Sequence, residues 1–153
     1  MRKYSACRGY QAGVGLIEVM VAVLILSIGF IGFAALQARS LSTNNSAMAR
    51  SMATIASYSI LDAMRADLPN AKAGQYNGTV VGNACPTAVT TLSKAQLVQW
   101  CGQLAEMLGK SASTKGEVAC DAVGSCTVTI TFDDSRAGTG GSNAQSAVTK
   151  AML

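Results

Sequence analysis

The pattern of apolar and polar residues divides the chain into an uncharged N-terminal run and a mixed remainder. A polar, basic start leads to Gly13, and the 18 consecutive residues from Val19 to Leu36 carry no charge. As an α-helix, this run is about 27 Å long, which is close to the hydrocarbon thickness of a bilayer. Residues 14–38 are therefore predicted to form a helix that can span a membrane.

The helical signal continues beyond the apolar run. No proline or turn cluster interrupts it between Leu16 and Pro69, which predicts about 50 residues of continuous helix stopped by Pro69. Residues 39–68 are amphipathic, and Asn44-Asn45-Ser46 has the weakest helix propensity. We expect a small head domain to pack on a stripe of apolar residues spaced by three and four. The stripe consists of Met48, Met52, Ile55, Tyr58, Leu61, Met64 and Leu68.

The remaining residues, 69–153, are rich in Gly, Asn, Thr and Ala, which is typical of short strands and loops. Tyr76–Val81 is a candidate strand. Ser93 followed by Gln96 forms a capping-box pattern and predicts a helix that ends before Gly109. Its predicted buried face carries Leu97, Trp100, Leu104 and Leu108.

A hairpin is predicted next, with strands over Val118–Cys120 and Cys126–Asp133. In the second strand, Cys126 and three apolar residues alternate with threonines, a period of two with one buried face. The glycine-rich stretch 137–143 is predicted to be a flexible loop. The predicted fold class is α+β, with a long N-terminal helix and a small antiparallel-sheet head domain over residues 69–153.

Charge is concentrated before Gly13. The formal net charge is +4, and Arg2, Lys3 and Arg8 all precede Gly13, leaving nine basic and eight acidic residues after it. Lysine and arginine are held on the cytoplasmic side of a membrane, so the start is expected to stay inside while the rest is exported. Because the remaining basic residues are scattered, no nucleic-acid partner is expected.

The cysteines fit an exported domain. Cys7 lies in the basic start, and Cys85, Cys101, Cys120 and Cys126 lie in the part predicted to be exported. An even number in a small exported domain favours disulfides, and four cysteines allow three pairings. The hairpin would bring Cys120 within reach of Cys126, which leaves Cys85 with Cys101. The sequence alone leaves the connectivity open.

No catalytic or metal centre is predicted. The chain has no histidine, which excludes histidine-based triads and imidazole ligands. The close Cys-x-x-Cys pairs typical of a four-thiolate zinc site are absent. Asp133 and Asp134 are interpreted as a solvated strand end, since adjacent strand residues point to opposite faces. We expect no cofactor and no enzymatic activity.

The segment Gly13-Val14-Gly15-Leu16-Ile17-Glu18-Val19-Met20 resembles the processing site of type IV prepilins and type II secretion pseudopilins, the class III signal peptide. The family pattern is Gly, usually Phe, often Thr, Leu, Ile or Leu, and Glu. Val14 and Gly15 depart from it. The run Glu18–Gln37 resembles the PilV-type minor pilins in particular. The resemblance covers about a sixth of the chain.

The resemblance implies a site and a set of partners. Prepilin peptidase would cut after Gly13, removing residues 1–13 as a leader, and would methylate the new amine of Val14. Glu18 would pair with the N-terminal amine of a neighbouring subunit. The implied partners are other minor pilins, the major pilin and the inner-membrane assembly platform.

The implied role is that of a minor pilin in initiation or at the tip of a type IV pilus, hence in piliation, twitching motility or adhesion. The protein would cross the bacterial inner membrane once, with its head in the periplasm, before entering the extracellular pilus. Other possibilities are a type II secretion pseudopilin, a DNA-uptake or adhesin pilin, and a membrane-anchored periplasmic protein that is not a pilin. The last would keep Met1 or begin after Ala35 or Ala38.

Overall fold

The computed structural model describes residues 13–137 and 141–153. The predicted leader therefore lies outside the described residues except for Gly13, and so do positions 138–140 of the predicted loop. The chain forms two compact units, the first ending at Ala38 and the second comprising Arg39–Leu153. Each unit is described by itself.

The long predicted helix is present as α1, Leu16–Ala66, with 51 residues. It ends two residues before the predicted end, so Pro69 is not the residue at which the helix stops. Instead, Pro69 lies in the first turn of a short second helix, α2, Leu68–Lys72. Proline is tolerated there because an N–H in the first helical turn has no partner within the helix.

The predicted packing stripe on α1 is mostly wrong. Met48, Ile55 and Tyr58 are 54%, 60% and 53% exposed, and Met52 and Leu68 are only half-buried. The buried face is instead built largely from small residues, which allow the helix to approach its neighbours closely. Its members are Ser46, Ala53, Ala56, Ser57, Ile60, Leu61 and Met64, so only Leu61 and Met64 of the stripe are buried.

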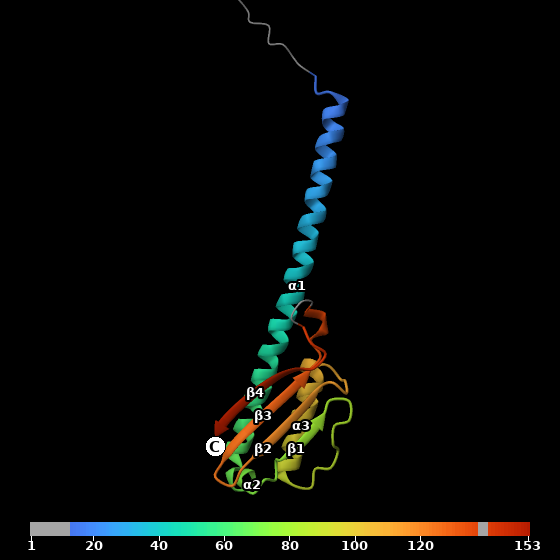
Figure 1. The fold of residues 1–153 in the computed structure, drawn as a ribbon. Coiled ribbons are helices and arrows are strands. Elements are labelled where there is room, and N and C mark those ends of the chain that lie inside the picture. Colours follow the sequence, from blue (N-terminus) through green and yellow to red (C-terminus); the bar gives the residue numbers. More distant parts are fainter. Residues whose placement is uncertain (1–12, 138–140) are drawn as a thin grey trace, which may run out of the picture. The chain divides into compact units, whose positions relative to one another are not determined.

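The second unit contains one antiparallel sheet, which confirms the predicted α+β fold class. Its strands lie in the order β1 (Gly78–Val81), β2 (Lys115–Cys120), β3 (Ser125–Phe132) and β4 (Gln145–Met152), as Figure 1 shows. The helical part of the second unit lies on one face of this sheet. The predicted alternation in β3 is confirmed, with Cys126, Val128, Ile130 and Phe132 buried. The pattern predicted no strand at β4.

The predicted head helix is α3, Leu92–Leu108, and it begins two residues earlier than a capping box with Ser93 as the cap suggested. The cap is Thr91, whose Oγ1 accepts the Lys94 amide at 3.3 Å, so the assignment of Ser93 as the cap is wrong. Ser93 is buried inside the first turn. Gly109 ends the helix with φ of 103°, a backbone conformation that glycine adopts readily.

Trp100 anchors the core, as predicted. Its ring is buried, and its Nε1–H donates to the carbonyl oxygen of Ala56 on α1 at 2.9 Å. The ring packs over Gly116 of β2, where a Cβ atom would lie 2.7 Å from Trp100 Cζ3 and 2.6 Å from Leu104 Cδ1. The absence of a side chain at Gly116 therefore lets α3 approach the sheet.

The end of β3 is not fully solvated, which corrects the interpretation of the two aspartates. Asp133 is exposed, and hydrogen bonding from Ser135 lowers the pKa of its carboxyl. Asp134 is buried, and its Oδ2 accepts the Ser46 hydroxyl at 2.6 Å. A guanidinium nitrogen of Arg50 lies 3.7 Å from the same oxygen. The strand end is thus connected to α1, just before a single 3₁₀ turn, η1, Ser135–Ala137.

Candidate processing and assembly site

Gly13, Val14 and Gly15 lie outside any helix and are exposed. Helix α1 begins only at Leu16, where the carbonyl oxygen of Gly15 accepts the amides of Glu18 at 3.0 Å and Val19 at 3.3 Å. A Cβ atom at Gly13 would meet nothing within 4 Å. The Gly13–Val14 peptide bond is therefore accessible in non-helical backbone, which suits it to proteolysis.

Glu18 lies in the first turn of α1, and its side chain is exposed. Within the part of the chain that the structure describes, its carboxylate forms no ion pair and no side-chain hydrogen bond. The unpaired N–H groups of a helix start favour a negative charge at this position. Glu18 lies four positions after Val14, which precedes the helix.

The first unit exposes its apolar side chains. From Val19 to Leu36, the large apolar side chains are between 49% and 72% exposed. Among the described helices, α1 alone is long and apolar enough to cross a membrane, and none of the described residues buries its most apolar stretch. Exposed apolar surface of this extent needs lipid or another protein to cover it.

The few polar or small residues inside this run are compatible with lipid or close helix packing. The Ser27 hydroxyl donates to the carbonyl oxygen of Val23 at 2.7 Å, so its hydrogen-bonding need is met within the helix. At Gly29 and Gly32, a Cβ atom would meet nothing within 4 Å. Such positions allow the backbone of another helix to approach.

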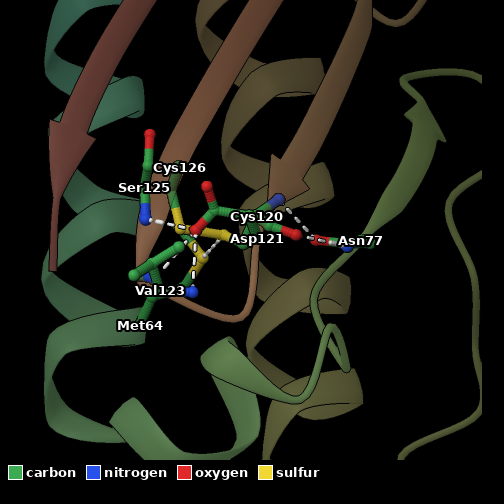
Figure 2. The surroundings of a disulfide bond; sticks show 8 residues. Met64, Asn77, Cys120, Asp121, Val123, Ser125 and Cys126 are labelled. Atoms are coloured by element: carbon green, nitrogen blue, oxygen red, sulfur yellow. Dashed lines mark hydrogen bonds between the residues drawn. A yellow bond between two sulfur atoms is a disulfide. The ribbon is translucent and has the colours of Figure 1, made fainter.

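The structure pairs Cys85 with Cys101 and Cys120 with Cys126. The first disulfide connects the segment after β1 to α3. The second joins two residues that lie opposite each other in the β2–β3 register, which is the pairing favoured by the predicted hairpin. Met64 Sδ of α1 contacts Cys120 Sγ at 3.7 Å, as Figure 2 shows. Both disulfides border the core of the second unit.

The turn beside the second disulfide is organised by Asp121. Its Oδ1 accepts three backbone amides, those of Val123, Gly124 and Ser125, at 2.8 to 3.0 Å (Figure 2). On the other side, the Asn77 side chain exchanges two hydrogen bonds with the backbone of Cys120. Both ends of the hairpin loop are therefore held by side chains.

A buried polar cluster near the end of α1 was not singled out by the sequence pattern. The Tyr76 hydroxyl donates to Asp67 Oδ2 at 3.0 Å and also contacts the side-chain amide of Gln96. Burial, and then the nearby Asp67 carboxylate, raise the pKa of Tyr76. Gln96, expected as part of a capping box, instead belongs to this cluster. No local sequence pattern predicts this cluster, because Asp67, Tyr76 and Gln96 come from separate segments of the chain.

The described residues contain no group of three or more His, Cys, Asp or Glu side chains able to hold a metal ion. A cavity of about 590 Å³ lies beside the first disulfide. It is lined by Asn83, Glu106 and Lys110, together with several small residues. It holds no nucleophile next to a base, the arrangement needed for covalent catalysis. The residues with a recognisable chemical role therefore lie at the start of α1.

Comparison with known proteins gives one match. Residues 8–34 match the family model described as the prokaryotic N-terminal methylation motif. No curated protein and no solved structure matches the chain. The motif covers Gly13, Val14 and Glu18, and points to a structural protein rather than an enzyme. The match supports a type IV pilin-like or pseudopilin protein with a class III signal peptide, processed by prepilin peptidase.

Proposed function

We propose that this protein is a minor pilin of the PilV type that takes part in starting type IV pilus assembly or lies near the pilus tip. One juxtaposition carries the processing part of the proposal: an accessible, non-helical Gly13–Val14 bond lies two residues before an exposed apolar helix whose first turn carries Glu18. The minor pilin role is supported by the resemblance of Glu18–Gln37 to the PilV-type minor pilins. Prepilin peptidase cleaves after Gly13 and methylates the amine of Val14.

The proposed organisation follows from this processing. Residues 1–13 are the leader, residues 14–38 span the inner membrane before assembly, and residues 39–68 carry the disulfide-bonded head, 69–153, in the periplasm. The leader holds Arg2, Lys3 and Arg8, which favour the cytoplasmic side. Removing the leader leaves an apolar segment that can leave the bilayer for a bundle of similar helices.

Glu18 acts in assembly rather than in cleavage. A carboxylate in an apolar environment is costly unless it is paired, and pairing with a positive group is stronger there than in water. Cleavage creates such a group, the amine of Val14. We propose that Glu18 of one subunit contacts the amine of a neighbouring subunit, so that an unprocessed chain lacks half of the contact.

The decisive experiment is mass spectrometry of the N-terminus of the full chain extracted from membranes. The proposal requires a chain that begins at methylated Val14. A chain that begins at Met1, or after Ala35 or Ala38, would show instead a membrane-anchored protein that is not a pilin.

A second experiment separates the pilus from the secretion system, because both use this motif. Deleting the gene should reduce surface piliation and twitching and leave the level of secreted enzymes unchanged. Loss of secreted enzymes with normal piliation would assign the protein to a type II secretion pseudopilus. The proposed minor pilin role would then be wrong, although the processing would stand.

A further inference from the structure

The first turns of α1 within the second unit contact the rest of that unit through other kinds of interaction than the turns that follow. Between Leu41 and Met52, the one buried residue is Ser46, and Leu41 and Met48 are exposed. The fully buried apolar core begins at Ala53, and before it only the small side chain of Ala49 packs against this core, partly buried. Hydrophobic burial, the main stabilising contribution to packing, therefore holds the helix from Ala53 onward but contributes little before it.

Polar contacts replace hydrophobic burial in these first turns. Ser42, Ser46 and Arg50 are spaced by four, so they lie along one line of the helix. The Ser42 hydroxyl donates to the carbonyl oxygen of Arg136, the Ser46 hydroxyl donates to Asp134 Oδ2 at 2.6 Å, and Arg50 lies 3.7 Å from that oxygen. We call these five residues the polar clasp.

The polar clasp is loosely packed. A cavity of about 230 Å³ lies between the helix and the strand end. It is lined by Ser42, Asn45, Ser46, Ala49, Asp133, Asp134, Arg136 and Ala137. A cavity of this size with several polar side chains in its walls can hold water. Water can therefore replace each hydrogen bond of the clasp when it opens, whereas it could not replace the apolar contacts of the core.

The helix itself is weak at this point. Ser42-Thr43-Asn44-Asn45-Ser46 consists of residues with low helix propensity. The Thr43 hydroxyl bonds the carbonyl oxygen of Arg39 in its own helix at 3.0 Å, a local alternative to regular helix bonding. Weak propensity, little apolar burial and a hydrated contact are the properties of a segment that opens locally at low free energy.

We infer that residues 42–50 of α1 are a releasable joint, closed by the polar clasp and able to open while the core of the second unit stays folded. Opening separates Ser42, Ser46 and Arg50 from Asp134 and Arg136. It leaves Trp100, the sheet and both disulfides in place. The inference rests on the contacts of the second unit alone, so it stands whether or not the proposed pilus function does.

Hydrogen exchange of the full chain in detergent micelles, measured by mass spectrometry, tests the joint. Ser46→Ala removes the hydrogen bond to Asp134 and should raise the exchange rate of the amides of residues 42–50 by roughly tenfold or more. The amides of β3 should exchange as in the parent. Ser51→Ala is the matched control, because the Ser51 hydroxyl bonds only the carbonyl oxygen of Ala47 in its own helix among the described contacts.

Two results would overturn the inference. One is an equal rise in residues 42–50 and in β3, which would mean that the clasp and the core open together. The other is the absence of a rise beyond that in Ser51→Ala. If Ser46→Ala does not fold, Ser42→Ala makes the same distinction, since it removes only the bond to the Arg136 carbonyl and leaves Asp134 paired.

Discussion

Gly116 illustrates how one residue fixes the distance between two elements. A side chain at this position would occupy the space filled by Trp100 and Leu104, which press α3 onto β2. The sequence does not reveal this requirement, because nothing around Gly116 distinguishes it from a glycine in a loop. The constraint comes from a helix that precedes β2 in the chain and lies across it in space.

We expect Gly116→Ala to lower the free energy of unfolding by about 1 to 3 kcal/mol, since it overpacks the contact with Trp100. Urea unfolding followed by the fluorescence of the sole tryptophan measures the change. Gly102→Ala is the control in α3, where a Cβ atom would meet nothing within 4 Å. It should be neutral or stabilising by up to about 1 kcal/mol. Equal effects of the two substitutions would contradict the close contact.

Tyr76 should make the folding stability of the protein depend on pH in the alkaline range. Its pKa is raised above the ordinary value of 10.0, chiefly because its ring and hydroxyl are buried. Above pH 10 the unfolded chain loses this proton while the folded chain keeps it. The contribution of Tyr76 to the free energy of unfolding should therefore be fully present below pH 10. It should decrease as the pH rises further, by up to about 1.4 kcal/mol per pH unit.

Comparing the parent with Tyr76→Phe between pH 8 and pH 11 checks this expectation by urea unfolding. The variant should be less stable at pH 8, because Asp67 loses a hydrogen-bond donor, and its stability should fall less steeply above pH 10. Tyr58→Phe is the control, since Tyr58 is exposed. A steep fall retained in Tyr76→Phe would assign the alkaline transition to other groups.

At the scale of elements, long and strongly patterned segments could be predicted and weakly patterned ones could not. The uninterrupted helix, the helix around Trp100 and the β2–β3 hairpin all have clear periodicity. Strand β4 has little contrast between its faces, because its inward residues include Ala147, Thr149 and Ala151, which are small and only half-buried. Its pairing with β3 gives it a structure that its own sequence barely indicates.

The packing face of α1 was mispredicted for a related reason. Periodicity identifies where large apolar residues recur, and Met48, Ile55 and Tyr58 recur at helical spacing. Close packing in the second unit instead selects Ala53, Ala56 and similar small residues. The candidate site could be proposed from the sequence alone, because Gly13, Val14 and Glu18 form a local motif that needs no tertiary contact, and their roles stay predictions.

The β2–β3 hairpin depends on its turn as well as on its disulfide. We expect Asp121→Ala to lower the free energy of unfolding by about 1 to 2 kcal/mol, because three backbone amides lose their acceptor. Asp121→Asn keeps one side-chain oxygen and should lose less. Thermal unfolding of the oxidised protein, compared for both variants, provides the measurement. Identical losses would show that the acceptor oxygen is not what stabilises the turn.

At the scale of the whole molecule, the first unit exposes apolar surface and the second has its own core. The first unit therefore depends on surroundings that the chain does not supply, whereas the second is stabilised by its own sheet, helices and disulfides. This division agrees with a subunit that is anchored in a membrane before it is incorporated into a larger assembly.

Under the proposed function, Glu18→Gln should leave cleavage after Gly13 intact and reduce the amount of protein in sheared pili at least tenfold. The amide keeps the size of the side chain but removes its charge, so the contact with a neighbouring amine is lost. Mass spectrometry of the N-terminus and immunoblots of sheared pili measure the two effects. Glu106→Gln, which changes an exposed residue of α3, is the control. Normal incorporation of the processed Glu18→Gln protein would exclude the pairing role.

The strand order sets which contacts of the second unit are local in the chain. Each strand pairs with the strand next to it in sequence. The turn between β2 and β3 is short, whereas α3 lies between β1 and β2, and η1 lies between β3 and β4. The contact of α1 with the segment after β3 joins Ser46 to Asp134, which are 88 positions apart. Because contacts between distant residues form slowly, we expect the docking of α1 onto the completed sheet to limit the folding rate. Helix α1 is synthesised before the strands, but its contacts with the sheet are expected to form last.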